Sequence, residues 1–132
     1  MNILHKIQPK YSLIPGTFSA PELINLDAIQ VLRSANAIVY DQLANTDLFK
    51  YAPKGVPLYY TGHFTGNRSQ RAAYLNELIL ELTYSFGHVV HIQGIEQALF
   101  QHPAQSLSYI DAFNIETNVV SITNVNPEIY LN

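Results

Sequence analysis

Short apolar runs alternate with longer stretches of helical periodicity along this chain, and that alternation limits the folds it can adopt. Short apolar runs bounded by turn residues are typical of strands, and apolar residues recurring every three or four positions are typical of helices. Strands separated by helices favour right-handed crossovers and a parallel sheet. The predicted strands span 11–14, 37–40, 57–60, 88–92 and 119–122, with helical segments at 19–35, 47–51, 67–86 and 98–113.

The pattern therefore predicts an α/β fold with three layers: a five-stranded, mostly parallel sheet with helices on both faces. A chain of 132 residues is the size of one domain, so we expect residues 1–132 to form a single unit with an irregular tail at 124–132. In such sheets ligands bind beyond the carboxyl ends of the strands. The loops of interest are therefore 15–20, 41–46, 61–67, 93–103 and 121–126.

Two predicted helices carry clear end signals. Ser19 and Glu22 form a capping box around Pro21, which stands where no amide hydrogen is needed. The second helix begins at Asn67 and ends at Gly87, a suitable carboxyl-terminal cap. The predicted buried stripes are Ile24, Ala28, Val31, Leu32 and Ala35 in the first helix, and Leu75, Leu78, Ile79, Leu82 and Phe86 in the second.

Composition narrows the choice of partners. The formal charge is -3, and the seven basic residues form no stripe, so nucleic acid is not an expected partner. Charged residues make up 13% of the chain, against roughly 25% in an average soluble domain. The low charge and the nine tyrosines favour a surface partly covered by another chain, most simply in a homodimer. The alternative is a polar surface of Asn, Gln, Ser and Thr.

The expected environment is the cytoplasm. The chain has no cysteine, which excludes disulfides, thiol catalysis and cysteine-based zinc sites. The first residues lack the apolar core of a signal peptide, and no apolar run is long enough to span a bilayer. We therefore expect a soluble cytoplasmic protein with no membrane partner.

Several motifs, in order along the chain, resemble the tetrapyrrole methylases, the uroporphyrinogen-III C-methyltransferase family. Residues 21–23 and 40–43 match the opening Pro-Glu-Leu and Tyr-Asp-x-Leu of that family. Residues 60–62 match its Tyr-x-Gly stretch, and Ser69 and Asn76 match the helix that follows. Residues 87–97 stand where the family has Gly-Lys-x-Val-Val-Arg-Leu-Lys-Gly-Gly-Asp-Pro. The resemblance covers residues 11–123, and the order and spacing of its motifs carry it.

The resemblance implies the fold of the amino-terminal domain of these enzymes. It also implies S-adenosylmethionine as the cofactor and a uroporphyrinogen-type tetrapyrrole as the substrate. By position, it assigns cofactor contacts to Gly94, Glu96 and Phe100, and a substrate cleft to Gly16, Asp41, Gly62 and His63.

The departures from the family pattern concern the chemistry. Ala20 stands where the family has the Asp of its first glycine-rich loop, a candidate proton acceptor, and His102 stands where it has an arginine. Thr17 and Phe18 fill space that this loop normally leaves open, and Ile95 replaces the second glycine of Gly-Gly-Asp-Pro. We therefore assign no catalytic residue.

In the family, the cofactor lies between two α/β domains, and the present sequence reaches only the start of the second, at residues 121–123. A half-site buries too little of such a cofactor, so the isolated chain is expected to bind none. The first hypothesis is a non-catalytic binding or interaction module that contacts a tetrapyrrole or a partner protein. The second is one half of a split methyltransferase, completed by a partner chain. The third is a flavodoxin-like nucleotide binder, for which residues 15–20 only partly fit a phosphate loop.

Other interpretations apply to single residues. Asp41 is typical of a turn or a helix cap, and Glu96 of a solvated loop. Four histidines invite a metal hypothesis, but two of them, three positions apart on a strand, point to opposite faces. No cysteine or carboxylate completes a ligand set, so structural or solvent roles are favoured. These histidines are His63, His88, His91 and His102.

Overall fold

The structure, a computed structural model, describes residues 8–17, 24, 26–94 and 109–120. It contains a five-stranded sheet with the order β3-β2-β4-β1-β5, in which every pair of neighbours is parallel. The predicted α/β class is confirmed. The strands are β1 (Lys10–Thr17), β2 (Ala37–Tyr40), β3 (Leu58–Tyr60), β4 (His88–Gly94) and β5 (Glu116–Val119), and the helices are α1 (Leu26–Arg33), the 3-10 helix η1 (Thr46–Tyr51) and α2 (Arg68–Phe86).

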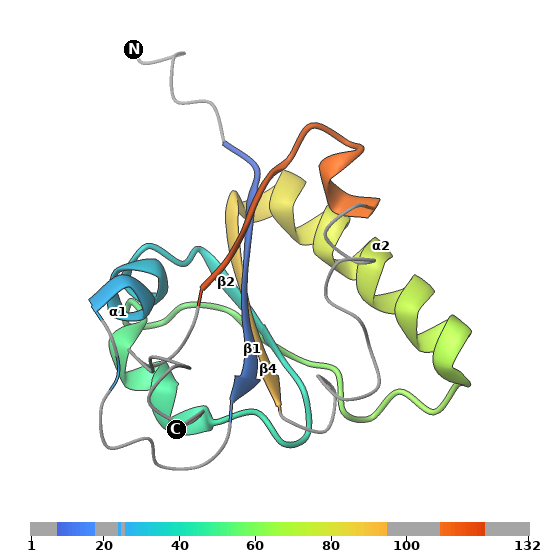
Figure 1. The fold of residues 1–132 in the computed structure, drawn as a ribbon, viewed down its shortest axis with the longest axis horizontal. Coiled ribbons are helices and arrows are strands. Elements are labelled where there is room, and N and C mark those ends of the chain that lie inside the picture. Colours follow the sequence, from blue (N-terminus) through green and yellow to red (C-terminus); the bar gives the residue numbers. More distant parts are fainter. Residues whose placement is uncertain (1–7, 18–23, 25, 95–108, 121–132) are drawn as a thin grey trace, which may run out of the picture.

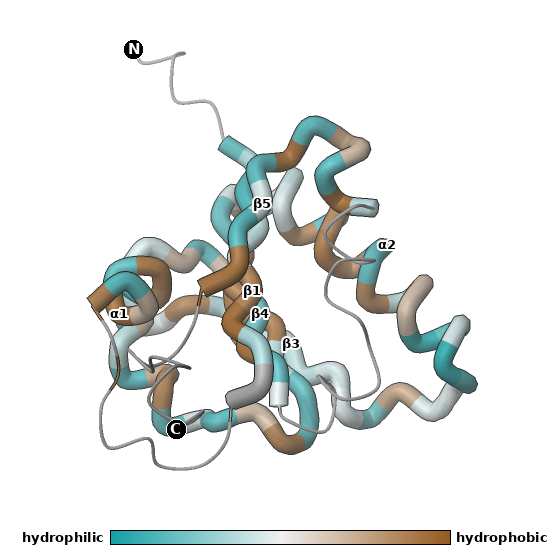
Figure 2. The backbone as a smooth tube through the Cα atoms, in the orientation of Figure 1, coloured by the Kyte–Doolittle hydropathy of each residue, from teal (hydrophilic) through white to brown (hydrophobic). Residues whose placement is uncertain are grey.

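Helices cover both faces of the sheet, as the sequence predicts (Figure 1). Because side chains alternate along a strand, each central strand contributes to two apolar layers. Tyr11 and Leu13 of β1 pack with α2, whereas Ile14 packs with α1 and η1. In Figure 2 the hydrophobic stretches of β1 and β4 lie between α1 and α2. Both layers are built mainly from fully buried aliphatic side chains.

Strand β1 is longer than predicted. The sequence suggests that Pro15 and Gly16 close the strand, but β1 continues to Thr17, which pairs with Gly94 of β4. The register shifts between Ile14 and Thr17. A proline cannot donate to the ladder and is tolerated where the pairing is irregular, so it does not have to end the strand.

The predicted start of the last strand, residue 119, is wrong. Strand β5 begins three residues earlier, at Glu116, and Val120 follows it and donates its amide to the Leu13 carbonyl at 2.9 Å. Residues 121 and 122 lie outside the described part. Within the described residues β5 pairs with β1 alone, so polar side chains are tolerated and the apolar signal is weak.

Helix α2 has the ends that the sequence predicts. Asn67 Oδ1 accepts from the Gln70 amide, and Gln70 Oε1 accepts from the Asn67 amide, both at 2.8 Å, which is a complete capping box. Gly87 ends the helix at a φ of 106°, and its amide bonds to the Thr83 carbonyl. Of the predicted apolar stripe, Leu75, Ile79 and Leu82 are buried and Leu78 is partly buried, whereas Phe86 is 37% exposed.

Helix α1 lies within the predicted segment, and the capping box predicted at 19–22 falls outside the described residues. Ala28, Leu32 and Ala35 are buried as predicted, with Ile24 and Val31 partly buried. Of the segment predicted as a broken helix, the structure describes residues 109–113, of which 109–111 are helical. None of the helices in the described ranges is long and apolar enough to cross a membrane.

We predict that Asn67→Ala lowers the free energy of unfolding by about 1 kcal/mol, because the Gln70 amide in the first turn loses its acceptor. Urea unfolding followed by circular dichroism measures the change. Ser69→Ala, on the exposed first turn of the same helix, is the matched control and should cost almost nothing. An equal loss in both variants would contradict a stabilising role for this cap.

Candidate functional site at the carboxyl edge of the sheet

Asp41 and Gly94 meet at the carboxyl edge of the sheet, where β2 and β4 lie side by side. Asp41 directly follows β2 and is 7% exposed. Both of its carboxylate oxygens accept from the Gly94 amide, at 3.0 and 2.9 Å. Oδ1 also accepts from the Leu43 amide at 3.2 Å. The carboxylate therefore forms a local turn contact and also fixes the end of β4.

The space beside the Gly94 α-carbon is occupied by the chain itself. A β-carbon built at Gly94 would lie 2.5 Å from Asp41 Oδ1, 2.6 Å from the Leu43 carbonyl carbon and 2.8 Å from the Ala44 amide nitrogen. Real β-carbons do not approach other atoms so closely, so this position requires glycine. The glycine thus allows β4 and the 41–44 turn to pack together, whatever else approaches this edge.

The loop after β3 contributes Gly62 and His63 to the same edge, one strand further out. The Thr61 amide donates to the Tyr40 carbonyl at 2.9 Å, which holds this loop against β2. Gly62 lies against the ring of Tyr60, and a β-carbon there would overlap that ring. The exposed His63 ring lies 5.8 Å from the Tyr60 ring, centroid to centroid. His63 is thus accessible to a ligand or partner at this edge.

The remaining candidates divide into two groups. Gly16 lies in the irregular last part of β1, which pairs with β4, so it belongs to the same edge. The structure therefore brings Gly16, Asp41, Gly62, His63 and Gly94 to the carboxyl ends of four adjacent strands. Glu96, Phe100, Ala20 and His102 lie outside the described residues, so their predicted roles stay predictions.

Two histidines are buried on opposite faces of β4. His91 Nδ1 lies 2.8 Å from the Tyr11 hydroxyl, on the α2 side, and burial lowers the pKa of His91 to about 4. Burial also raises the pKa of the Tyr11 phenol. Nε2 of His91 is buried without a hydrogen-bond partner among the described residues. Both groups are therefore neutral at pH 7, and the contact is a buried polar pair.

His88 joins two serines on the α1 side. The Ser34 hydroxyl donates to the Val31 carbonyl at 2.8 Å, so its oxygen accepts from His88 Nδ1 at 3.0 Å. Nε2 then accepts from the Ser12 hydroxyl at 2.6 Å. Burial, with a smaller contribution from the charge of Lys10, lowers the pKa of His88. Within the described ranges no three His, Asp or Glu side chains are grouped to hold a metal ion.

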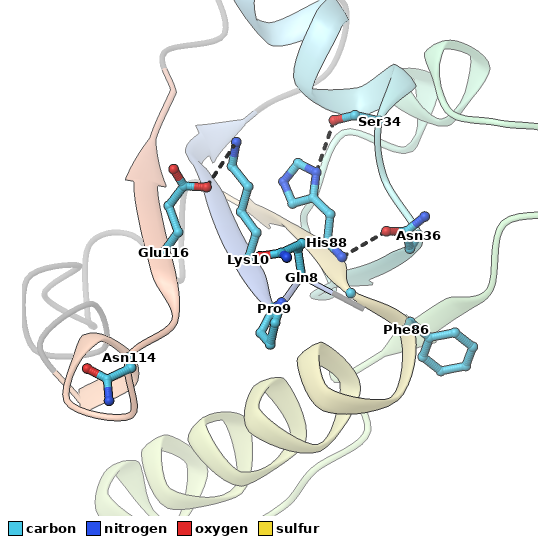
Figure 3. A pocket seen from close by; sticks show the side chains of 10 residues that line it. Gln8, Pro9, Lys10, Ser34, Asn36, Phe86, His88, Asn114 and Glu116 are labelled. Carbon is cyan, nitrogen blue, oxygen red and sulfur yellow. Dashed lines mark hydrogen bonds and ion pairs between the residues drawn. The ribbon is translucent and has the colours of Figure 1, made fainter. Parts of the chain in front are cut away.

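A hollow of about 760 Å³ opens at the opposite, amino-terminal edge of the sheet (Figure 3). Several of its polar side chains form contacts within the chain. Lys10 Nζ lies 3.6 Å from Glu116 Oε2, and Asn36 Oδ1 accepts from the His88 amide at 2.8 Å. These contacts join the first residues of three strands. We therefore regard this hollow as structural and the carboxyl edge as the candidate site.

The parallel sheet, the two helical layers and the polar carboxyl edge define an open α/β domain of the class that binds ligands beyond its strand ends. No protein-family model matches the chain. Curated proteins do match it in sequence. The uroporphyrinogen III methyltransferase of Arabidopsis thaliana, described as S-adenosyl-L-methionine-dependent and chloroplastic, is 26% identical over 100 residues, covering 76% of this chain and 27% of that protein. The uroporphyrinogen-III C-methyltransferase of Methanobacterium ivanovii is 35% identical over 80 residues, which cover 61% of this chain and 34% of that protein.

Solved structures agree with these relatives. The native form of uroporphyrin III C-methyl transferase from Thermus thermophilus matches with a TM-score of 0.67 at 21% identity, over 86% of this chain and 48% of that one. The structure of that enzyme complexed with S-adenyl homocysteine matches with a TM-score of 0.64 at 20% identity, over 86% of this chain and 45% of that one. At this level of identity the structural likeness establishes the fold.

The relatives and structural neighbours are thus tetrapyrrole methylases, each matched over part of its length, which confirms the resemblance seen in the motifs. The chain spans between 27% and 34% of these two curated relatives and less than half of the solved structure.

Proposed function

We propose that this chain is a non-catalytic relative of the S-adenosylmethionine-dependent tetrapyrrole methyltransferases and acts as a binding or interaction module. The observation that carries the proposal is the residue that follows Gly94. The side-chain-free space of Gly94 itself is occupied by Asp41 and the 41–44 turn. A ligand that needs bare main chain would have to approach at the next residue, and that residue is Ile95. Ala20, in place of the family carboxylate, supports the loss of proton transfer.

The polar carboxyl edge of the sheet is retained under this proposal. Asp41 still fixes the end of β4, and the exposed His63 keeps a polar group at the edge. A module of this kind can bind a tetrapyrrole carboxylate or a partner protein without methyl transfer. The low charged content and the half-exposed Leu58 and Tyr60 on the edge strand β3 support a homodimer, which sedimentation equilibrium would measure.

Isothermal titration of the purified chain with S-adenosylhomocysteine tests the proposal. We expect no measurable binding up to millimolar ligand, because a branched side chain stands where main-chain contact is needed. The variant Ile95→Gly with Ala20→Asp, which restores the family residues, tests whether these positions are responsible. Micromolar binding by the unaltered chain alone would refute the non-catalytic interpretation.

A second candidate function is one half of a split methyltransferase that a partner chain completes. It is favoured by Leu43, which is 46% exposed in the turn between Asp41 and η1, at the edge where a second domain would have to lie. This candidate predicts that S-adenosylhomocysteine binds only when the partner is present. The same titration, repeated with the partner chain added, separates the two functions.

A further inference from the structure

The charges of this chain are divided between its two halves. Residues 1–71 contain all seven basic residues and four acidic ones, a formal charge of +3. Residues 72–132 contain no Lys or Arg and six acidic residues, a formal charge of -6, which together give the -3 of the whole chain. Such an asymmetry favours a partner of opposite charge on the second half.

Three of the exposed aromatic residues in this acidic half lie together, and we call them the aromatic surface: Tyr84, Tyr109 and Phe113. They are 54%, 40% and 44% exposed. The rings of Tyr109 and Phe113 lie 5.4 Å apart, and the Tyr84 hydroxyl donates to the Phe113 carbonyl at 3.4 Å. Figure 1 shows the 109–111 turn, in orange, beside α2. Exposed aromatic groups of this kind are typical of interaction sites.

The aromatic surface has a rigid base. Ile110, between its members, is fully buried against Leu75, Ile79 and Leu82 of α2. The turn is therefore attached to the helix by apolar packing. A partner that binds here meets rings whose backbone is already fixed, so little conformational entropy is lost on binding.

The surroundings of the aromatic surface are acidic. Glu77 and Glu81 are exposed on α2, seven and three positions before Tyr84, so helical spacing places them on the same side. Asp111 is exposed on the turn itself. The last turn of α2 has no basic residue, so the partial negative charge of the helix end is not offset there.

We propose that the aromatic surface docks a lysine- or arginine-rich amphipathic segment of a partner protein. Apolar side chains of that segment would cover the three rings, and its cations would lie over ring faces and near Glu81 and Asp111. A second copy of this chain is a poorer occupant, since a twofold contact would oppose acidic side chains of the same kind.

The proposal is independent of the methyl-donor question. Helix α2 ends where β4 begins, so the aromatic surface lies toward the amino-terminal edge of the sheet. The candidate site lies at the other, carboxyl edge.

The probe is a fluorescein-labelled 18-residue peptide with lysine and leucine at helical spacing, titrated with the full chain and read by fluorescence anisotropy in 150 mM NaCl. The lysine peptide should bind, and the same peptide with glutamate for lysine should not. Tyr84→Ser and Phe113→Ser should each raise the Kd at least tenfold, and Glu81→Gln about threefold. Leu26→Ser, an exposed apolar residue on α1, and Asp27→Asn are the matched controls and should change the Kd less than twofold.

Amide chemical shifts of the isotope-labelled protein, recorded with and without the peptide, locate the contact. Changes are expected at 77–86 and 109–114. The proposal is overturned if the peptide does not bind, or if Tyr84→Ser and Phe113→Ser change its Kd no more than the controls do. Chemical-shift changes confined to 41–44 and 60–63 would place the peptide at the carboxyl edge and would overturn the proposal as well. Self-association that Tyr84→Ser abolishes, measured by sedimentation, would assign the surface to a second copy instead.

Discussion

Gly94→Ala is expected to lower the free energy of unfolding by about 3 kcal/mol. The added methyl group would meet Asp41 Oδ1 and the main chain of Leu43 and Ala44, at distances between 2.5 and 2.8 Å. Two of these three atoms belong to backbone, so they cannot move aside as the end of a flexible side chain can. Overpacking of this kind costs about 1 to 3 kcal/mol, and displacing the carboxylate weakens a charge-assisted hydrogen bond as well. The urea midpoint at pH 7, with an unchanged slope, measures the loss.

Gly55→Ala is the matched control. Gly55 has a positive φ of 82°, but a β-carbon built there would meet no other atom within 4 Å. The cost there is conformational only, about 1 to 2 kcal/mol. In the Asp41→Ala background the cost of Gly94→Ala should fall, because one of the three close contacts is gone. If Gly94→Ala costs no more than Gly55→Ala, the close packing of β4 against the 41–44 turn is not what requires glycine here.

The strands that were predictable are the ones covered on both faces. Residues 37–40 and 88–92 are nearly continuous apolar runs because helices pack on each side of them. Strand β5 has one neighbour among the described strands, and three of its four residues are polar. It therefore lacks the apolar run from which a strand is predicted. The capping box of α2 was equally predictable, because Asn67 and Gln70 are three residues apart and their contact depends on local geometry alone.

The contacts of the site depend on strand order, which no local pattern contains. Asp41 and Gly94 are 53 positions apart and meet because β4 inserts next to β2. Tyr11 and His91 are 80 positions apart and meet through the pairing of β1 with β4. The sequence did contain a signal for the contact between Asp41 and Gly94. A polar residue directly follows one predicted strand and a glycine follows another, and the two would meet if these strands were neighbours. Choosing the neighbours required the three-dimensional structure.

Acidification from pH 7 to pH 4 is expected to destabilise the fold by about 3 kcal/mol through His91 alone. Burial lowers the pKa of His91 to about 4, from 6.5 in the unfolded chain. Above pH 6.5 the ring is neutral in both the folded and the unfolded chain, so the protonation of His91 does not reduce the free energy of unfolding. Between pH 6.5 and 4 the unfolded chain takes up a proton that the folded chain refuses, so stability falls as the pH falls. Each tenfold difference in proton affinity corresponds to about 1.4 kcal/mol, which gives the expected loss.

His88 acts in the same direction, because burial lowers its pKa too. The variant His91→Gln should be less stable than the unaltered chain at pH 7, since its polar amide must be accommodated in a buried layer. On acidification it should lose less stability, because the histidine that the unfolded chain protonates is gone. His63→Gln is the control, because the His63 side chain is exposed and its replacement removes no buried polar group. Urea unfolding at half-unit steps between pH 7.5 and 4 measures all three proteins. A profile for His91→Gln that runs parallel to that of the unaltered chain would show that the Tyr11–His91 pair is not the group that makes this fold sensitive to acid.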